Sequence, residues 1–135
     1  MTASKRVLVI DDESTREALQ IILESEGCEV LLAEHGQAGL TEIASYTPDV
    51  ILLDMRMPVM DGRAFTDAYH RLPGPHAPII VITAAADAAR SATEVGAACC
   101  VPKPFGISEL LEALEQADRW AWLRRALSSR SLPDR

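Results

Sequence analysis

Five side chains in this sequence have the types and positions that metal-assisted chemistry needs, namely Asp11, Asp12, Asp54, Thr83 and Lys103. Each ends or closely follows a short run of apolar residues, as Asp54 follows residues 50–53. Such a run is typical of a strand buried on both faces of a parallel sheet. Ligands of these sheets bind beyond the carboxyl ends of the strands, so the five side chains are expected at one rim.

The three aspartates are expected to bind a hard cation. Carboxylates at short range raise one another's pKa, so a crowded group of them needs a positive charge. Oxygen ligands alone favour Mg²⁺ over Zn²⁺. Lys103 can balance one negative charge, and Thr83 can donate a hydrogen bond. An aspartate can also act as a nucleophile and form an acyl phosphate, and a cation, an amine and a hydroxyl supply most of what phosphoryl transfer requires.

Hydrophobic periodicity and turn residues predict the elements that hold these side chains. Continuous apolar runs predict strands, and apolar residues three and four apart, ended by Gly or Pro, predict helices. The predicted strands are residues 7–10, 28–33, 50–54, 78–83 and 98–101. The predicted helices are residues 14–26, 37–45, 62–72 and 84–95, and a long last helix begins at Glu109.

The alternation of strands and helices predicts an α/β fold with a doubly wound, five-stranded parallel sheet. The common strand order for this arrangement is 2-1-3-4-5, in a flavodoxin-like three-layer sandwich. The first, third, fourth and fifth strands carry the five side chains and are neighbours in this order. One domain is expected over residues 5–117, followed by a C-terminal helical extension over residues 118–135.

Composition excludes several classes of protein. A chain of 135 residues with 48% hydrophobic residues is globular, and a net charge of -7 disfavours direct binding of nucleic acid. Three cysteines without metal-ligand spacing fit a reduced, cytoplasmic protein. The apolar residues near the N-terminus are too few for a signal peptide or a membrane span, so no membrane contact is expected.

Together, and in this order, the motifs resemble the receiver domain of two-component response regulators, in the stand-alone form of chemotaxis regulators. The resemblance covers about residues 5–117. It rests on residues 10–12, 53–62, 83–84, 96–97 and 102–105. A receiver domain is a phosphoacceptor switch more than an enzyme, although it contributes to its own phosphorylation and dephosphorylation.

The resemblance implies a role for each acidic residue. Asp54 would be the phosphoacceptor. Asp12 and Asp54 would bind Mg²⁺ directly, Asp11 would act mainly through water, and the backbone carbonyl of Arg56 would be a further ligand. The Arg56 side chain stands beside the phosphoryl site, where it could shield or hold the acyl phosphate and change its lifetime.

The resemblance also implies how phosphorylation is read. Lys103 would pair with a phosphoryl oxygen, Thr83 would follow the phosphoryl group, and the Lys103–Pro104 peptide bond would be cis. Cys100 departs from the family pattern, because many receivers have Tyr or Phe there that turns inward when the threonine moves. A thiol cannot make that aromatic rotation, which puts this version of the switch in doubt.

The expected partners follow from the same resemblance. The phosphoryl donor would be a sensor histidine kinase, a histidine phosphotransfer protein or a small acyl phosphate. The sequence leaves no room for a DNA-binding domain, so output is expected through a downstream target protein, unless the chain is a piece of a longer protein. A homodimer through the fourth helix, fifth strand and fifth helix is also possible.

The C-terminal extension allows two interpretations. Trp120, Leu123 and Leu127 form a helical stripe separate from the one that faces the sheet, and residues 119–135 contain five arginines and one acid. The extension either packs back on the domain as an amphipathic tail or forms a docking or dimer surface, since Trp and Arg dominate interface energetics.

Other functions compete with the receiver interpretation. Asp11 and Asp12 could simply cap the first helix. An aspartyl-phosphate phosphatase is also α/β and Mg²⁺-dependent, but those enzymes carry Asp two residues after the nucleophile, where this chain has Arg56. A flavin-binding module would need a phosphate-binding loop after the first strand, where this chain has carboxylates. A degenerate receiver that binds partners without phosphorylation would not need the complete acidic set.

Overall fold

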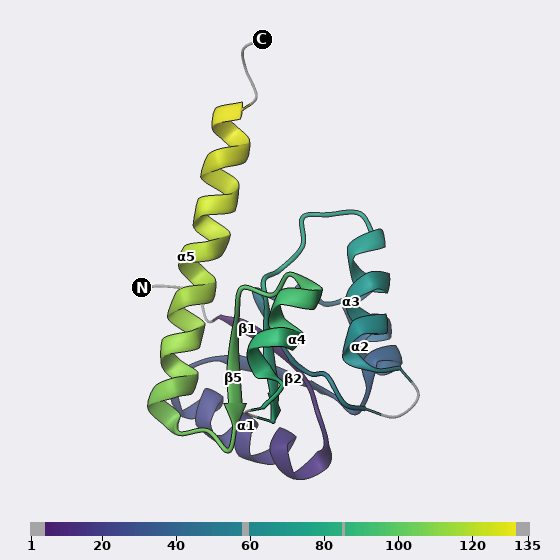
Figure 1. The fold of residues 1–135 in the computed structure, drawn as a ribbon, viewed down its shortest axis with the longest axis vertical. Coiled ribbons are helices and arrows are strands. Elements are labelled where there is room, and N and C mark those ends of the chain that lie inside the picture. The colour runs from purple at the N-terminus through teal and green to yellow at the C-terminus, as the bar shows by residue number, and fades with distance from the viewer. Residues whose placement is uncertain (1–4, 58–59, 85, 132–135) are drawn as a thin grey trace.

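The computed structural model describes residues 5–57, 60–84 and 86–131, and side chains only up to residue 127. Five strands and five helices alternate along this part of the chain (Figure 1). The strands are β1 (Arg6–Ile10), β2 (Glu29–Ala33), β3 (Val50–Asp54), β4 (Ile79–Ala84) and β5 (Cys99–Lys103). The helices are α1 (Glu13–Ser25), α2 (Gly36–Ile43), α3 (Gly62–Arg71), α4 (Ala88–Val95) and α5 (Ile107–Ser131).

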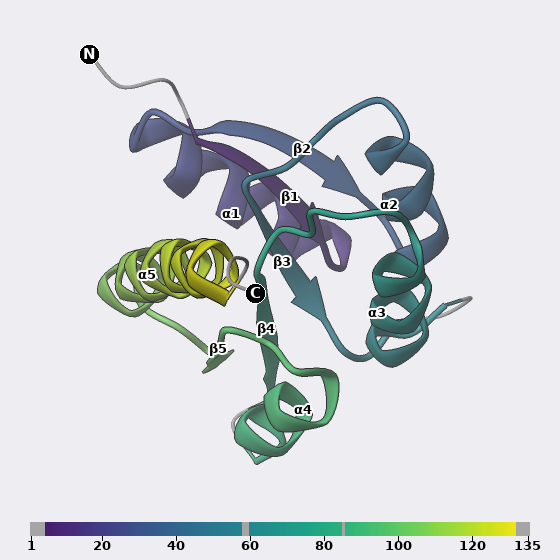
Figure 2. The same cartoon turned by 90° about the horizontal axis from the view of Figure 1, so that it is seen from above.

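The strands form one parallel sheet in the order β2-β1-β3-β4-β5, which confirms the predicted fold. β3 lies at the centre, and all five of its residues are buried. Helices cover both faces of the sheet (Figure 2). On one face, α1 and α5 pack through Leu19, Leu23 and Leu110. On the other, α2, α3 and α4 pack around Phe65. A strand buried on both faces explains why the predicted strands were continuous apolar runs.

Two predicted boundaries near the site were wrong. The helix predicted from residue 84 begins at Ala88, because β4 continues to Ala84, which pairs in register with Lys103. Lys103 therefore ends β5 instead of following it. Pro102 has no backbone N–H, and an edge strand such as β5 tolerates this because one of its sides has no neighbouring strand to receive a hydrogen bond.

The last helix begins at Ile107, two residues before the predicted start. The backbone N–H of Gly106 donates to Oε1 of Glu109 at 2.8 Å, which fixes the first turn. The helix continues to Ser131, so the predicted extension is a direct continuation of α5 that projects beyond the sheet (Figure 1). Across the described residues, no helix combines the length and apolar character that a bilayer crossing needs.

Gly39 shows why a poor helix former occupies α2. A Cβ atom there would lie only 2.6 Å from Cδ1 of Ile10 and 3.3 Å from the ring of Phe65. The absence of a side chain lets α2 approach β1, the strand that carries Asp11 into the site.

Candidate functional site

The carboxylates of Asp11, Asp12 and Asp54 converge at the carboxyl end of the sheet. Asp11 and Asp12 directly follow β1, and Asp54 ends the neighbouring strand β3. One oxygen from each carboxylate lies within 4.8 Å of the other two, the spacing of a group that can hold a metal ion. The sheet order alone produces this cluster, because parallel neighbours end at the same edge.

Lys103 Nζ lies among these three carboxylates. It is 3.1 Å from Asp11 Oδ1 and 3.8 Å from an oxygen of each of Asp12 and Asp54. Burial alone would lower the pKa of Lys103, but the hydrogen bond that Lys103 donates to Asp11 and the negative charges of the three aspartates outweigh burial and raise the pKa. The amine is therefore a permanent positive charge at the site.

Asp11 is the most deeply buried of the group, with 1% of its surface exposed. Burial, and then the charge of Asp54, raises its pKa from 3.8 to about 7, against the opposing hydrogen bonds from the Asp12 amide and Lys103. Its Oδ2 is buried without a hydrogen-bond partner among the described residues. A buried carboxylate oxygen without a donor is costly, and a hard cation would satisfy it. The residues present therefore fit a divalent metal.

Asp12 has a second role besides this cluster. Its Oδ1 accepts from the backbone N–H of Thr15 at 2.9 Å and caps α1. This hydrogen bond is the main reason why the pKa of Asp12 is lowered. The capping interpretation and the metal interpretation are thus compatible, since the carboxylate has a second oxygen that faces Lys103.

Asp54 and Thr83 lie on neighbouring strands at the same edge. Asp54 is 6% exposed, and its Oδ1 accepts from the backbone N–H of Arg56 at 3.1 Å. Thr83 is 2% exposed and pairs in register with Pro102, next to Lys103. The peptide bond Lys103–Pro104 is cis, as expected.

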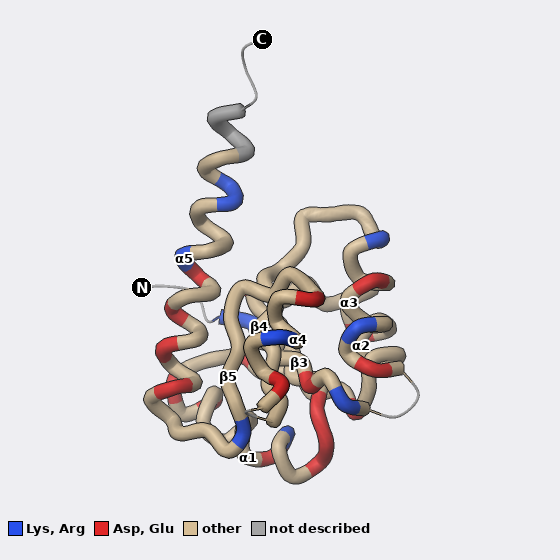
Figure 3. The backbone as a smooth tube through the Cα atoms, in the orientation of Figure 1, with Lys and Arg blue, Asp and Glu red and all other residues tan. Residues whose placement is uncertain are grey.

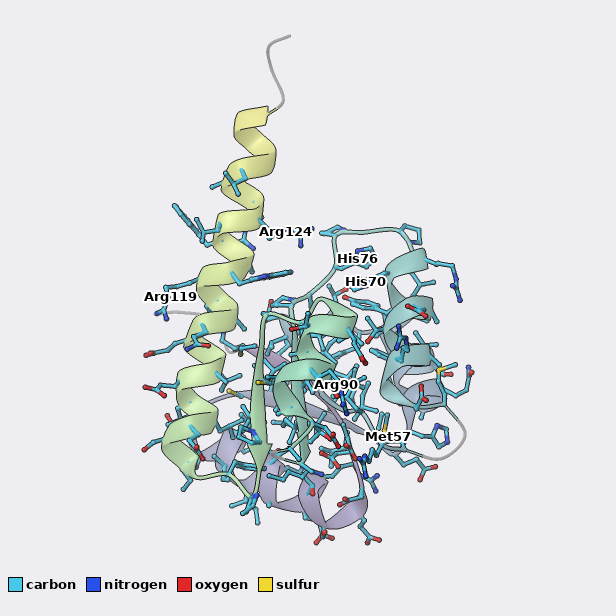
Figure 4. The ribbon with its side chains drawn as sticks, viewed as in Figure 1. Met57, His70, His76, Arg90, Arg119 and Arg124 are labelled. Atoms are coloured by element: carbon cyan, nitrogen blue, oxygen red, sulfur yellow. The ribbon has the colours of Figure 1, made fainter. Side chains whose placement is uncertain are left out.

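The side chain of Arg56 makes a contact that the sequence did not predict. Its Nη2 lies 2.5 Å from Oδ2 of Asp87, which immediately precedes α4. Arg90, which Figure 4 labels, lies on the first turn of α4. Its Nη2 donates to the other carboxylate oxygen of Asp87 at 2.7 Å. Within the residues that the structure describes, the Asp87 side chain makes no capping hydrogen bond to α4. Only the position of Asp87 just before a helix could have drawn attention to it.

The chain belongs to the response regulator receiver family. The family model described as "Response regulator receiver domain" matches residues 7–115. The DNA-binding transcriptional regulator NtrC of Salmonella typhimurium is 41% identical over 112 residues, which are 82% of this chain and 24% of that protein. The response regulator MprA of Mycolicibacterium vanbaalenii is 36% identical over 132 residues, 96% of this chain and 52% of that protein. The chain thus spans about a quarter to a half of these relatives.

Solved structures agree with this assignment. The chemotaxis response regulator CheY4 of Vibrio cholerae superposes with a TM-score of 0.77 and 30% identity, over 85% of this chain and 99% of that one. NtrX of Brucella abortus superposes with a TM-score of 0.86 and 28% identity, over 98% of this chain and 31% of that one. The chain is therefore a receiver domain of two-component signal transduction, with the fold of a CheY-like switch.

Proposed function

We propose that Asp54 is the phosphoacceptor and that its phosphorylation depends on Mg²⁺. The observation that carries this proposal is the placement of Lys103 Nζ within 3.1 to 3.8 Å of three carboxylates. One of these, Asp11, has a buried oxygen with no hydrogen-bond partner in the described part of the chain. Asp11, Asp12 and Asp54 would hold the ion, with the backbone carbonyl of Arg56 as a further ligand. When bound, Mg²⁺ neutralises charge on the transferred phosphoryl group.

In the proposed reaction a carboxylate oxygen of Asp54 forms a bond to phosphorus. The bond from phosphorus to the donor breaks, and its electron pair leaves with the imidazole nitrogen of a phosphohistidine or with the oxygen of a small acyl phosphate. Lys103 pairs with an oxygen of the phosphoryl group, and the hydroxyl of Thr83 donates to another. Asp11 would help to hold the ion, mainly through water.

The same groups would assist hydrolysis of the acyl phosphate, so the domain would limit the lifetime of its own signal. We therefore regard the chain as a switch with self-phosphorylation and self-dephosphorylation activity. The donor would be a sensor histidine kinase or a histidine phosphotransfer protein, and phosphorylation would shift a pre-existing equilibrium between two conformations.

Output would pass to a downstream target protein through the face formed by α4, β5 and α5, which could also serve as a homodimer surface. Cys100 lies on this face, half-buried against the α2–α3–α4 side of the sheet. Because a thiol replaces the aromatic side chain, we propose that movement of Thr83 is transmitted through the segment before α4. Free cysteines support the proposed cytoplasmic location.

The alternative functions fit the site less well. A phosphatase of the aspartyl-phosphate class needs a general acid two residues after Asp54, but Arg56 occupies that position and contacts Asp87. A flavin phosphate would be repelled by the three carboxylates. A receiver that never accepts phosphate would gain nothing from the two buried carboxylates of Asp11 and Asp54 beside Lys103, since buried charges are costly.

One experiment tests the phosphoacceptor. The protein is incubated with acetyl phosphate with and without Mg²⁺, and the intact mass is measured. We expect a gain of about 80 Da, one phosphoryl group, only with Mg²⁺. Asp54→Asn should abolish it, while Asp61→Asn, which changes an exposed aspartate at the cap of α3, should retain it. An adduct that persists in Asp54→Asn would refute the proposal.

A further inference from the structure

A cavity lies at the amino end of the sheet, on the edge opposite the acidic cluster. Lys5 directly precedes β1 and Asp49 directly precedes β3, and both line this cavity of about 430 Å³. Its other wall is the middle of α5, where the lining residues include Asp118, Arg119, Trp122 and Arg125. The volume falls in the range of cavities that hold small organic molecules. The cavity is therefore a candidate ligand site separate from the phosphorylation site.

The α5 wall of this cavity lies where the charge of the helix changes sign. Residues 107–118 contain four acids and no basic residue, whereas residues 119–131 contain four arginines and no acid. Figure 3 shows acidic residues along the first half of α5 and basic residues on the projecting half. The whole chain has a net charge of -7, so the second half of α5 is a local concentration of positive charge. Such a concentration attracts anions.

Both acidic side chains that line the cavity already have partners. Asp118 forms an ion pair with Lys5 across the cavity. Oδ2 of Asp49 accepts a hydrogen bond from the backbone N–H of Arg6 at 2.8 Å. Because these carboxylates are engaged, the two arginines of the α5 wall are the groups that remain to bind a ligand.

Arg119 and Arg125 flank Trp122 along α5. Each arginine is three residues from Trp122, so the indole lies between the two along one side of the helix. In the part of the chain that the structure describes, neither arginine forms a hydrogen bond or an ion pair. Trp122 is 61% exposed, which leaves its ring accessible to a planar group. Figure 4 shows that Arg124, by contrast, lies on a different side of the helix from Arg119.

We propose that this cavity binds a nucleoside diphosphate or triphosphate. The base would stack on the indole of Trp122, and the guanidiniums of Arg119 and Arg125 would pair with phosphate oxygens, which their N–H groups fit in pairs. A nucleoside alone would leave the arginines without a partner, and an inorganic anion or an acidic peptide would leave the indole without a stacked ring. A nucleotide uses both features of the wall. The proposal does not depend on phosphorylation of Asp54.

Calorimetric titration of the full chain with ADP tests the proposal, in EDTA so that no divalent ion links ADP to the acidic cluster. We expect a dissociation constant below about 1 mM. Arg119→Gln and Arg125→Gln should each raise it about fivefold or more, because a charge-assisted hydrogen bond is lost. Trp122→Ala should weaken binding of ADP but not of pyrophosphate, which has no ring to stack. Arg124→Gln is the matched control and should have little effect, since it removes an equal charge that lies over Trp120 instead.

Three results would overturn the proposal. One is the absence of binding at about 5 mM ADP. Another is ADP binding that persists in the double variant R119Q/R125Q, since ADP would then bind elsewhere. The third is pyrophosphate or polyglutamate binding as tightly as ADP, since the wall would then recognise negative charge alone. Circular dichroism of each variant shows whether α5 remains folded. Loss of the mass adduct in the phosphorylation experiment would leave ADP binding unaffected, so the two proposals fail separately.

Discussion

The guanidinium of Arg56 contacts the carboxylate of Asp87 at 2.5 Å and so joins the segment after β3 to the start of α4. The backbone N–H of the same arginine donates to Asp54. Arg56 is thus bonded at one end to the proposed phosphoacceptor and at the other to the residue before α4. A phosphoryl group on Asp54 would compete with Asp87 for the guanidinium.

This competition predicts opposite effects of two substitutions on the lifetime of the acyl phosphate. Asp87→Ala should free Arg56 to shield the phosphoryl group and slow hydrolysis, whereas Arg56→Ala should speed it. The Arg56 side chain is 74% exposed, and an exposed pair is worth at most about 1 kcal/mol, so each change should be up to about fivefold. Hydrolysis is followed by intact mass after removal of the donor.

Arg90→Ala provides the control for this pair. Arg90 also contacts Asp87, but its removal leaves the contact between Arg56 and Asp87 in place. The hydrolysis rate should therefore stay close to that of the parent. Equal rates in Arg56→Ala and the parent would mean that the guanidinium has no part in the lifetime.

Removal of the Lys103 charge should separate metal binding from phosphoryl transfer. The ammonium group competes with a cation for the three carboxylates, so Lys103→Met should bind Mg²⁺ more tightly. Phosphorylation by acetyl phosphate should nevertheless slow by roughly a hundredfold, because a charge that stabilises the transferred group is lost. Mg²⁺ titration by calorimetry and the rate of adduct formation measure the two effects. Weaker Mg²⁺ binding in this variant would contradict the prediction.

The sequence predicted those site residues that lie at the ends of strands. Asp54 was found because β3 is apolar on both faces and therefore ends visibly at its first polar residue. Lys103 was found through its flanking prolines and the family motif, although its strand was predicted to end two residues too early. Strand pairing decided that boundary, and pairing is not visible in a local pattern.

Contacts between long polar side chains could not be predicted. The ion pair of Arg56 and Asp87 joins residues 31 positions apart on two loops, and neither residue lies in a periodic run. The sequence also did not explain why glycine occupies position 39, since helix propensity gives only the destabilising effect of Gly39 on α2. Its benefit depends on the distance to Ile10, which the packing of α2 against β1 determines.

The raised pKa of Asp11 predicts how stability depends on pH without divalent cations. Its pKa is about 7 in the folded protein and 3.8 ordinarily, so between these values the folded state holds a proton that the unfolded chain has released. The free energy of unfolding should therefore fall as pH rises from about 4 to about 7, by roughly 2 to 4 kcal/mol. Urea unfolding in EDTA across this range measures the slope.

Two substitutions and the addition of Mg²⁺ test whether Asp11 causes this dependence of the free energy of unfolding on pH. Asp11→Asn should flatten it, because the amide does not titrate. Asp12→Asn should not, since the pKa of Asp12 is lowered instead of raised. Saturating Mg²⁺ should raise the stability of the parent above about pH 7, as any ligand of the folded state does. A slope that persists in Asp11→Asn would mean that another group titrates.

Gly39→Ala should destabilise the protein although alanine is the better helix former. The new Cβ would meet Cδ1 of Ile10 at 2.6 Å, and overpacking typically costs about 1 to 3 kcal/mol against a helix-propensity gain of about 1 kcal/mol. Ile10→Val removes the colliding methyl group. The two substitutions together should therefore cost at least about 0.5 kcal/mol less than the sum of their separate effects. Additive effects in urea unfolding would mean that α2 moves away from β1 and that the close approach at Gly39 is not required.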